Sequence, residues 1–179
     1  GQATATGTAV AVVTTSGTAV ANLLPAAVEA DRSCQPLLLL TADRPARLKG
    51  CGANQTVNQE DFLQPVCRWF GEGPPEGLHQ ATPEALRDLA FSSWCQAQGH
   101  NRDAPGPVHL NLPFEEPLHA SIDQQAAVVI EPLASTQDVQ PTLMDVSDAP
   151  RLDPNRPGVV VAGPWRGLSP QLKAYQQAV

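Results

Sequence analysis

The chain has 179 residues, 42% of them hydrophobic, which is enough for one domain with a core, or for one domain and part of another. Eighteen acidic residues against 11 basic ones give a net charge of −7, which excludes the positive surface that binds nucleic acid or an anionic membrane. No apolar run approaches the ~20 residues that span a bilayer, so we expect no membrane insertion.

The first predicted unit is a strand, a tight turn and a helix. The β-branched apolar run Val10–Thr14 predicts a buried strand, and the polar residues after it predict the turn. Apolar residues recur at helical spacing over 18–32, where Pro25 is expected to kink or restart the helix. The apolar run Leu37–Thr41 predicts a second strand, and two strands joined through a helix predict a parallel sheet.

The rest of the predicted domain continues this alternation after a polar loop from Ala42 to Gln55. Thr82, Pro83 and Glu84 are typical of a helix start, with an N-cap, a proline in the first position and an acid in the first turn. In chain order, the predicted elements are a short helix over Asn58–Leu63 capped by Asn58, a strand over Val66–Phe70, a loop over Gly71–Gly77, a helix ending at Gln98, and a strand over Pro107–Leu112.

The composition changes after Pro113. Residues 114–157 are rich in Pro, Asp, Gln, Ser and Ala, with little periodicity, which predicts an interdomain linker. An apolar run over 158–162 and a helix start near Ser169-Pro170 then predict the opening of a second α/β domain. We therefore expect an α/β fold with an incomplete parallel-sheet domain over 1–113, a linker, and the start of a second domain over 158–179.

Both ends of the chain resemble cuts in a longer protein. Residue 1 is not methionine, the first seven residues lack a signal-peptide pattern, and residues 172–179 predict a helix with no stop signal. We therefore expect a segment of a longer cytoplasmic enzyme, in which an incomplete sheet leaves an edge strand open to pairing with another chain. The cysteines form no C-x-x-C pair and the histidines no ligand spacing, so we expect reduced, mostly buried thiols and no metal site.

The turn from Thr15 to Thr18 is the first candidate ligand site. It lies between a predicted parallel strand and a helix, where ligands bind in open α/β sheets because the first N–H groups of the helix are unpaired. Gly17 would let a ligand approach the backbone closely. The alternative is structural, with Ser16 capping the helix and Gly17 only permitting the turn.

The loop over Ala42–Gln55 is the second candidate, because it leaves the same edge of the predicted sheet. Arg44 can form paired hydrogen bonds with a carboxylate or a phosphate. Asn54 and Gln55 carry donors and acceptors that can orient a polar substrate. The alternatives are an ion pair of Arg44 with Asp43 or a capping role, and a loop that satisfies its own amide groups.

No Ser/His/Asp set and no paired-carboxylate site stands out elsewhere. Glu115 and Glu116 are adjacent, so they would point apart in an extended chain, and we expect solvated linker charges. His109 falls inside a predicted strand, where we expect it to pack rather than to bind a metal. Trp165-Arg166 is expected to be a surface cap of the second domain.

Three stretches, in this order, resemble one known family: TSGTAVANLLPAAVEA (15–30), LLLLTADRP (37–45) and CGANQTVNQ (51–59). They are similar to the MenD family, the thiamine-diphosphate-dependent 2-succinyl-5-enolpyruvyl-6-hydroxy-3-cyclohexene-1-carboxylate synthases of menaquinone and phylloquinone biosynthesis. The stretch over 107–118 resembles the end of that family's pyrimidine-binding domain, and the stretch over 158–163 resembles the opening of its central domain. TADRP followed by GANQ is the specific part, since TSG turns are shared among thiamine enzymes.

The resemblance implies a pyrimidine-binding domain whose C-terminal part is residues 1–113, followed by a central and a diphosphate-binding domain. It implies decarboxylation of 2-oxoglutarate on thiamine diphosphate anchored by Mg²⁺, and addition of the succinyl carbanion equivalent to isochorismate. The family site lies between subunits, which implies a homodimer or homotetramer. By resemblance, Arg44 holds a substrate carboxylate, and Gln55 lies near the reacting carbon with Asn54 as its neighbour. The cofactor is contacted by Thr15, Ser16, Gly17 and Thr18.

Two parts of the family's site are absent from these residues. The glutamate that activates the aminopyrimidine lies upstream of Gly1, and Glu29 is not its match. The motif for diphosphate and magnesium belongs to the last domain. We therefore predict no complete catalytic site and no activity for this segment alone. The alternatives are another thiamine-diphosphate enzyme, of the acetolactate synthase or 2-oxo-acid decarboxylase type, and a non-enzymatic α/β binding module.

Overall fold

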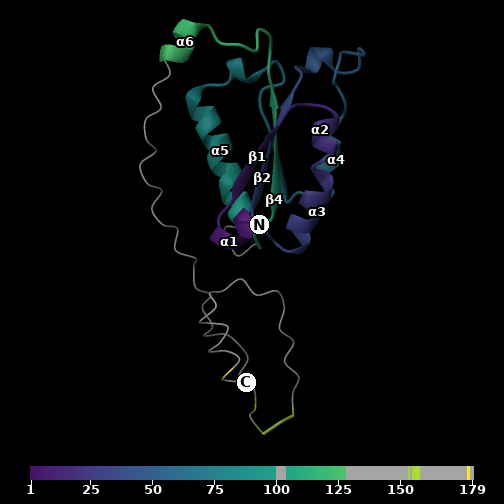
Figure 1. Cartoon of the computed structure of the whole chain (residues 1–179), viewed down its shortest axis with the longest axis vertical. Coiled ribbons are helices and arrows are strands. Elements are labelled where there is room, and N and C mark those ends of the chain that lie inside the picture. The colour runs from purple at the N-terminus through teal and green to yellow at the C-terminus, as the bar shows by residue number, and fades with distance from the viewer. Residues whose placement is uncertain (100–103, 128–152, 154, 158–176, 178–179) are drawn as a thin grey trace. The chain divides into compact units, whose positions relative to one another are not determined.

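The structure is a computed structural model of the chain and describes residues 1–99, 104–127, 153, 155–157 and 177. The chain divides into two units, residues 1–119 with 166–179 and residues 120–165, which are described separately. The first unit holds a parallel sheet flanked by helices (Figure 1), so the predicted α/β fold is confirmed. The predicted strand over 158–162, the helix near Ser169-Pro170 and the Trp165-Arg166 cap lie outside the described residues.

The sheet has four described strands, which are all parallel. They are β1 (Val10–Thr14), β2 (Leu37–Asp43), β3 (Trp69–Glu72) and β4 (Pro107–Pro113). Their order is β1-β2-β4-β3, so β4 lies between β2 and β3 although it comes last in the chain. Within the described residues, β1 and β3 are therefore the edge strands.

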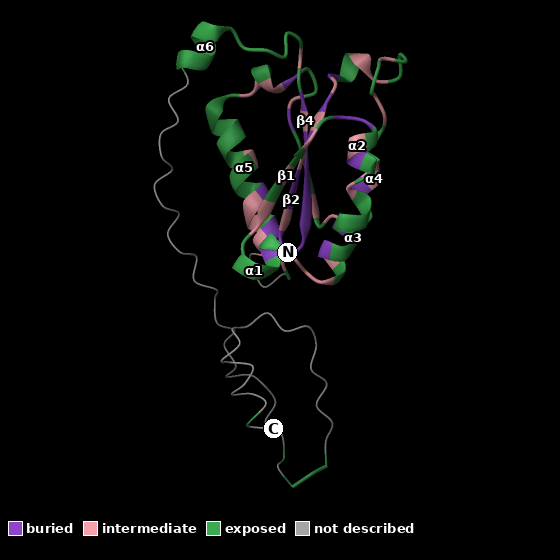
Figure 2. Ribbon diagram, in the orientation of Figure 1, coloured by how far each residue is buried: buried purple, intermediate pink, exposed green. Residues whose placement is uncertain are grey.

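Helices cover both faces of the sheet (Figure 1). The first face packs against α2 (Thr18–Ala21), α3 (Leu24–Arg32) and α4 (Gln59–Leu63), and the opposite face against α5 (Pro83–Gln98). β2 is buried or half-buried along its whole length (Figure 2), because helices cover both sides of it. This explains why its leucine run is continuously apolar rather than alternating. The buried core residues are Val20, Ala27, Leu39 and Leu63 on the first face, and Leu38, Ala97 and Val108 on the second.

Local signals in the sequence place several helix boundaries. The predicted helix over 18–32 is interrupted between α2 and α3, and Pro25 stands in the first turn of α3, which confirms the expected restart. Thr82 caps α5 by accepting a hydrogen bond from the Ala85 N–H, as predicted.

Other boundaries differ from the prediction. The strand expected from Val66 begins only at Trp69, because the N–H groups of Val66 and Cys67 bond to the Leu63 carbonyl and extend the end of α4. Asn58 precedes α4, but its side chain makes no capping hydrogen bond. β2 continues two residues beyond its predicted end, which places Asp43 within the sheet.

Short helical segments occur where none was predicted. They are α1 (Gln2–Thr6), the 3₁₀ turns η1 (Ala46–Leu48) and η2 (Leu78–Gln80), and α6 (Ile122–Ala127) of the second unit. The stretch predicted as a linker therefore contains a helix at its start. No helix in the described part of the chain has the length and apolar character of a membrane span.

The four cysteines are free thiols. Cys51 is exposed and the others are half-buried, so the expectation of mostly buried thiols is too strong. Cys67 packs at the edge of the core of the first face, and burial raises its pKa to about 12.

Candidate functional site

The carboxyl ends of the four strands form one continuous rim, which we call the polar rim. The register sets Thr14 beside Thr41, Thr41 beside Asn111, and Asn111 beside Glu72. The turn after β1 and the loop after β2 both leave the sheet at this rim, as predicted. Ligands of open parallel sheets bind at this edge, so the two candidate stretches lie where a site is expected.

Gln55 locks the turn after β1 to the loop after β2. Its Nε2 donates to the Thr15 hydroxyl at 2.9 Å and to the Ser16 carbonyl at 2.8 Å. In return, the Ser16 hydroxyl donates to the Gln55 carbonyl at 3.0 Å. Both amide donors of Gln55 are used in this way, so the side chain can offer a ligand its Oε1 as an acceptor.

Gly17 is required by this contact. Its φ of 80° lies in the region that favours glycine, and a Cβ on it would lie 2.8 Å from Cγ of Gln55. The space beside Gly17 is therefore filled by a protein side chain. The alternative in which Ser16 caps the following helix is wrong, because α2 has no side-chain cap and the Ser16 hydroxyl bonds to Gln55 instead.

Arg44 starts the loop after β2, and its backbone is fixed by the residue before it. The Asp43 Oδ1 accepts a hydrogen bond from the Arg44 N–H at 2.8 Å, and the Asp43 Oδ2 lies 2.9 Å from Nζ of Lys49. The Arg44 guanidinium makes no hydrogen bond or ion pair with any residue that the structure describes. The predicted alternative of an Arg44–Asp43 ion pair is therefore wrong.

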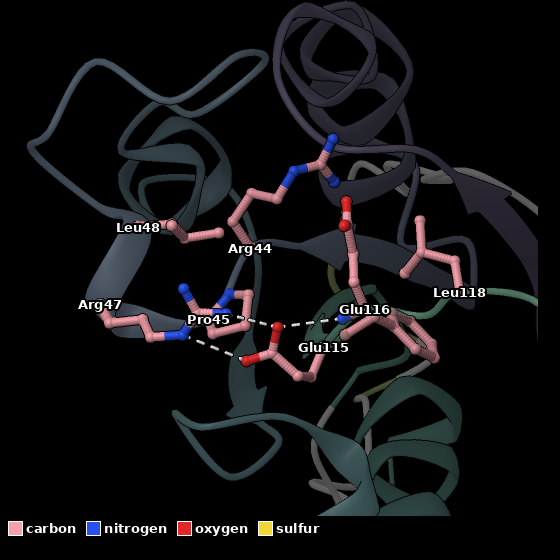
Figure 3. A pocket seen from close by; sticks show the side chains of 8 residues that line it. Arg44, Pro45, Arg47, Leu48, Glu115, Glu116 and Leu118 are labelled. Atoms are coloured by element: carbon pink, nitrogen blue, oxygen red, sulfur yellow. Dashed lines mark hydrogen bonds and ion pairs between the residues drawn. The ribbon is translucent and has the colours of Figure 1, made fainter.

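A pocket of about 420 Å³ opens beside Arg44 (Figure 3). The side chains of Arg44 and Glu116 point toward one another across it. Arg47 instead binds Glu115 through two hydrogen bonds, which lower the pKa of Glu115. Glu115 is thus paired rather than a free linker charge. Of the two arginines that line the pocket, Arg47 forms an ion pair and Arg44 forms none with the described residues.

A group of polar side chains, which the sequence did not predict to come together, lies next to this rim. Each has no exposed surface, and we call the group the buried polar cluster: Thr41, Asp43, Gln59, His109 and Asn111. Asn111 is its centre, because its Oδ1 accepts from Thr41 at 3.0 Å and Gln59 at 2.7 Å, and its Nδ2 donates to Asp43 at 2.8 Å. The available signal was the polar residues that interrupt otherwise apolar strands.

Lys49 neutralises the charged part of the cluster. Its Nζ lies 2.9 Å from the Asp43 carboxylate and 3.0 Å from the Glu60 carboxylate. Burial acts to lower the pKa of Lys49, but the hydrogen bonds to these two carboxylates outweigh it, so the pKa lies above the usual value. Lys49 is therefore committed to the protein and is not the cation that a ligand would meet.

His109 is neutral at pH 7, because burial lowers its pKa to about 4. Its Nε2 lies 2.8 Å from the Thr41 hydroxyl, and its ring meets Phe70 edge to face with the ring centres 5.3 Å apart. These contacts confirm the predicted packing role. Its Nδ1 is buried and has no partner within the described part of the chain.

The structure gathers some of the predicted site residues and leaves others apart. Thr15, Ser16, Gly17 and Gln55 form one contact network, and Arg44 joins the same rim through Asp43. Asn54 is exposed, and the hydrogen bond found for it in the described residues uses its carbonyl, which accepts from Thr56 at 3.4 Å. Thr18 is the exposed first residue of α2.

Residues 1–64, which contain the turn after β1 and the loop after β2, match the family model described as thiamine pyrophosphate enzyme, N-terminal TPP binding domain. This match assigns the part of the sheet that holds β1, β2 and the two candidate stretches to an N-terminal domain of a thiamine pyrophosphate enzyme. Three similar proteins carry the name 2-succinyl-5-enolpyruvyl-6-hydroxy-3-cyclohexene-1-carboxylate synthase. They come from Synechococcus sp. (strain CC9902), 63% identical, Parasynechococcus marenigrum (strain WH8102), 65% identical, and Prochlorococcus marinus (strain MIT 9313), 58% identical.

Each of these alignments covers 100% of this chain and 32% of the relative. The chain belongs to the family of these synthases. It spans about a third of the length of the curated relatives it matches.

Proposed function

We propose that this chain is the part of a thiamine-diphosphate-dependent 2-succinyl-5-enolpyruvyl-6-hydroxy-3-cyclohexene-1-carboxylate synthase that contacts the pyrimidine side of the cofactor and one substrate carboxylate. The complete enzyme decarboxylates 2-oxoglutarate and adds the succinyl unit to isochorismate, in menaquinone or phylloquinone biosynthesis. One observation carries the proposal: a thiamine-enzyme turn, locked by Gln55, shares a rim with Arg44, whose guanidinium has no partner among the described residues.

The residues of the turn fit part of thiamine diphosphate. Thr15 and Thr18 are exposed and carry hydroxyl groups at the rim, where the Thr15 hydroxyl accepts from Gln55. Ser16 and Gly17 are buried and bond to Gln55 and Gln59. The buried Thr14 hydroxyl, one residue before the turn, has no partner within the described residues. When bound, the cofactor supplies the electron sink for decarboxylation of a 2-oxo acid. In this proposal, Thr15 and Thr18 contact it, and Ser16 and Gly17 shape the turn.

The diphosphate and Mg²⁺ need a different set of groups, because magnesium prefers carboxylate and phosphate oxygens. The described residues contain no group of three or more His, Cys, Asp or Glu side chains that could hold a metal ion. The proposal therefore assigns Mg²⁺ and the diphosphate to parts of the complete enzyme outside this chain. For the same reason, it assigns no turnover to these 179 residues alone.

Arg44 is the residue that binds a substrate carboxylate in this proposal. Both substrates carry more than one carboxylate, and a chain with a net charge of −7 needs a cation at the place where it binds one of them. An arginine without a protein partner can form two parallel hydrogen bonds with one carboxylate. Gln55 then accepts a hydrogen bond through Oε1, and Asn54 offers a second amide at the end of the same loop.

The proposal extends to the organisation of the protein. Residues 1–113 are the C-terminal part of the pyrimidine-binding domain, 114–157 are a linker, and 158–179 open the central domain. Since the family site lies between subunits, the complete enzyme is a homodimer or homotetramer, and we place it in the cytoplasm. The change of composition after Pro113 supports these boundaries.

Product analysis tests the proposal. The full-length protein that contains this chain is incubated with thiamine diphosphate and Mg²⁺, once with 2-oxoglutarate and isochorismate and once with pyruvate. We expect a coupled product from the first mixture and none from the second. Products from pyruvate would assign the acetolactate synthase or decarboxylase type, and a protein without turnover would be a binding module. The 179-residue chain serves as the inactive control.

A further inference from the structure

We propose that Gln59 is a positioning residue, which holds the turn at Ser16-Gly17 and the strand end at Arg44 in one fixed relation. This inference rests on the proposed function, in which the turn contacts the cofactor and Arg44 binds a substrate carboxylate. Gln59 is the first residue of α4 and is fully buried, and it does not line the pocket beside Arg44. It therefore acts through other residues and touches neither ligand.

The Gln59 amide bonds to three separate segments. Its Oε1 accepts from the Gly17 N–H at 2.9 Å, in the turn after β1. Its Nε2 donates to the Ala42 carbonyl at 2.8 Å, near the end of β2, and to Asn111 Oδ1 at 2.7 Å, on β4. One acceptor and both donors of the amide are used, which no hydrocarbon side chain and no single carboxylate can reproduce.

From Gln59, two more hydrogen bonds reach the backbone of Arg44. The Asn111 Nδ2 donates to Asp43 Oδ2 at 2.8 Å, and Asp43 Oδ1 accepts from the Arg44 N–H at 2.8 Å. The side chains along this route are fully buried, so water cannot replace a bond that is lost. A shift of the turn after β1 is thereby transmitted to the position from which the Arg44 side chain extends.

Kinetics of variants of the full-length synthase test this role. Gln59→Met keeps the length of the side chain and removes its hydrogen bonds. We expect it to raise both the KM for the carboxylate substrate that Arg44 binds and the Kd for thiamine diphosphate about tenfold, which corresponds to one buried hydrogen bond. The matched control is Ser93→Ala, which removes a buried hydroxyl of α5, on the opposite face of the sheet. It should leave both constants near those of the parent.

Two further variants separate positioning from loss of stability. For the carboxylate substrate that Arg44 binds, the double variant Arg44→Ala/Gln59→Met should raise the KM by clearly less than the product of the two single effects, because Gln59 acts on that substrate in part through Arg44. Gln59→Glu keeps an acceptor for Gly17 and loses the amide donors, so it should raise the KM more than the cofactor Kd. This variant also serves if Gln59→Met does not fold.

The outcomes that overturn the role differ from those that overturn the proposed function. Three outcomes would show that Gln59 is not a positioning residue, while the parent enzyme stays active. The two single effects could multiply fully in the double variant, or Gln59→Glu could weaken the binding of substrate and cofactor equally. Gln59→Met could also give the same constants as Ser93→Ala. A parent enzyme that makes no product from 2-oxoglutarate and isochorismate would overturn the proposed function, and this inference with it.

Discussion

The carboxylate of Asp43 holds the backbone of Arg44 and leaves its guanidinium alone: Oδ1 accepts the Arg44 N–H at 2.8 Å, while Oδ2 lies 2.9 Å from Nζ of Lys49. One carboxylate thus fixes where the Arg44 side chain begins, and a lysine neutralises that carboxylate. The Arg44 guanidinium forms no ion pair with any residue that the structure describes. At this rim, Asp43 therefore positions Arg44, and Lys49 rather than Arg44 neutralises the charge of Asp43.

Replacing Arg44 by alanine in the full-length synthase should raise the KM for at least one carboxylate substrate about tenfold to a hundredfold, because hydrogen bonds to charged groups contribute ~1.5–3 kcal/mol. The affinity for thiamine diphosphate should change little. Steady-state kinetics with each substrate and a cofactor titration measure both. Arg87→Ala is the control, since among the described residues Arg87 forms only an exposed pair with Glu84 on α5, on the opposite face of the sheet. Unchanged KM values in Arg44→Ala would contradict the assigned role.

Two glycines with nearly the same φ allow the effect of a close contact to be compared. Gly17 and Gly52 have φ of 80° and 78°, but a Cβ on Gly52 would meet nothing within 4 Å, whereas one on Gly17 would lie 2.8 Å from Gln55. Gly52→Ala should therefore cost about 1–2 kcal/mol of folding free energy for the left-handed backbone alone. Gly17→Ala should cost more, and it should also lower activity by displacing Gln55. Thermal unfolding and turnover check this, and equal effects of the two substitutions would refute it.

The buried His109 predicts a loss of stability in mild acid. Its pKa is about 4 in the folded protein against the ordinary 6.5, so the unfolded chain binds more protons between these values. The contribution of His109 to the free energy of unfolding is therefore fully present above about pH 6.5 and is lost as the pH falls toward 4. Below pH 4, this group causes no further change. Denaturant unfolding of the full-length protein at pH 7, 6 and 5 measures the slope.

Substitution separates His109 from the other titrating groups. His109→Gln keeps a polar group near Thr41 and removes the titration, so the slope between pH 6.5 and 4 should flatten. His79→Gln, at an exposed histidine, is the control substitution. If both variants keep the slope of the parent, the acid sensitivity has another source.

The cysteines should differ in their reaction with iodoacetamide. Cys51 is exposed, whereas burial raises the pKa of Cys67 to about 12, so that almost no thiolate forms there at neutral pH. In the native full-length protein, peptide mass spectrometry should find Cys51 labelled first and Cys67 labelled only after unfolding. Cys51→Ser should remove the earliest labelling event. Labelling of Cys67 at the rate of Cys51 would show that the core around Cys67 opens in the native protein.

The elements that border the rim could be predicted because their signals are local. The run Leu37–Thr41 is typical of a strand covered on both faces, and β2 is buried or half-buried along its whole length. The run Val10–Thr14 also forms a strand, but β1 is an edge strand of the described sheet and its residues alternate between half-buried and exposed, so the prediction that it is buried is wrong. The helix between them makes the strands parallel, and parallel strands end at the same edge. The neighbourhood of Ser16 and Gln55 follows from that geometry, although 39 residues separate them.

The buried polar cluster could not be predicted in the same way. Gln59 and Asn111 are 52 residues apart, and their contact depends on the strand order, which no local pattern specifies. Asn111 would be far from Thr41 if β3 lay between β2 and β4. Gln59 alone is an ordinary polar residue near a helix start, so its role emerges only once the sheet is assembled.

β4 is the last of these strands to be synthesised, and it occupies the middle of the sheet. Until residue 113 has left the ribosome, β3 has no strand to pair with among those described here, and Asp43 and Gln59 have no Asn111 to bond. Contacts across so many residues close late, because the intervening chain must first be ordered. Until then, the side chains of Asp43 and Gln59 lack the partner that later connects them, and we expect water to bond to them instead.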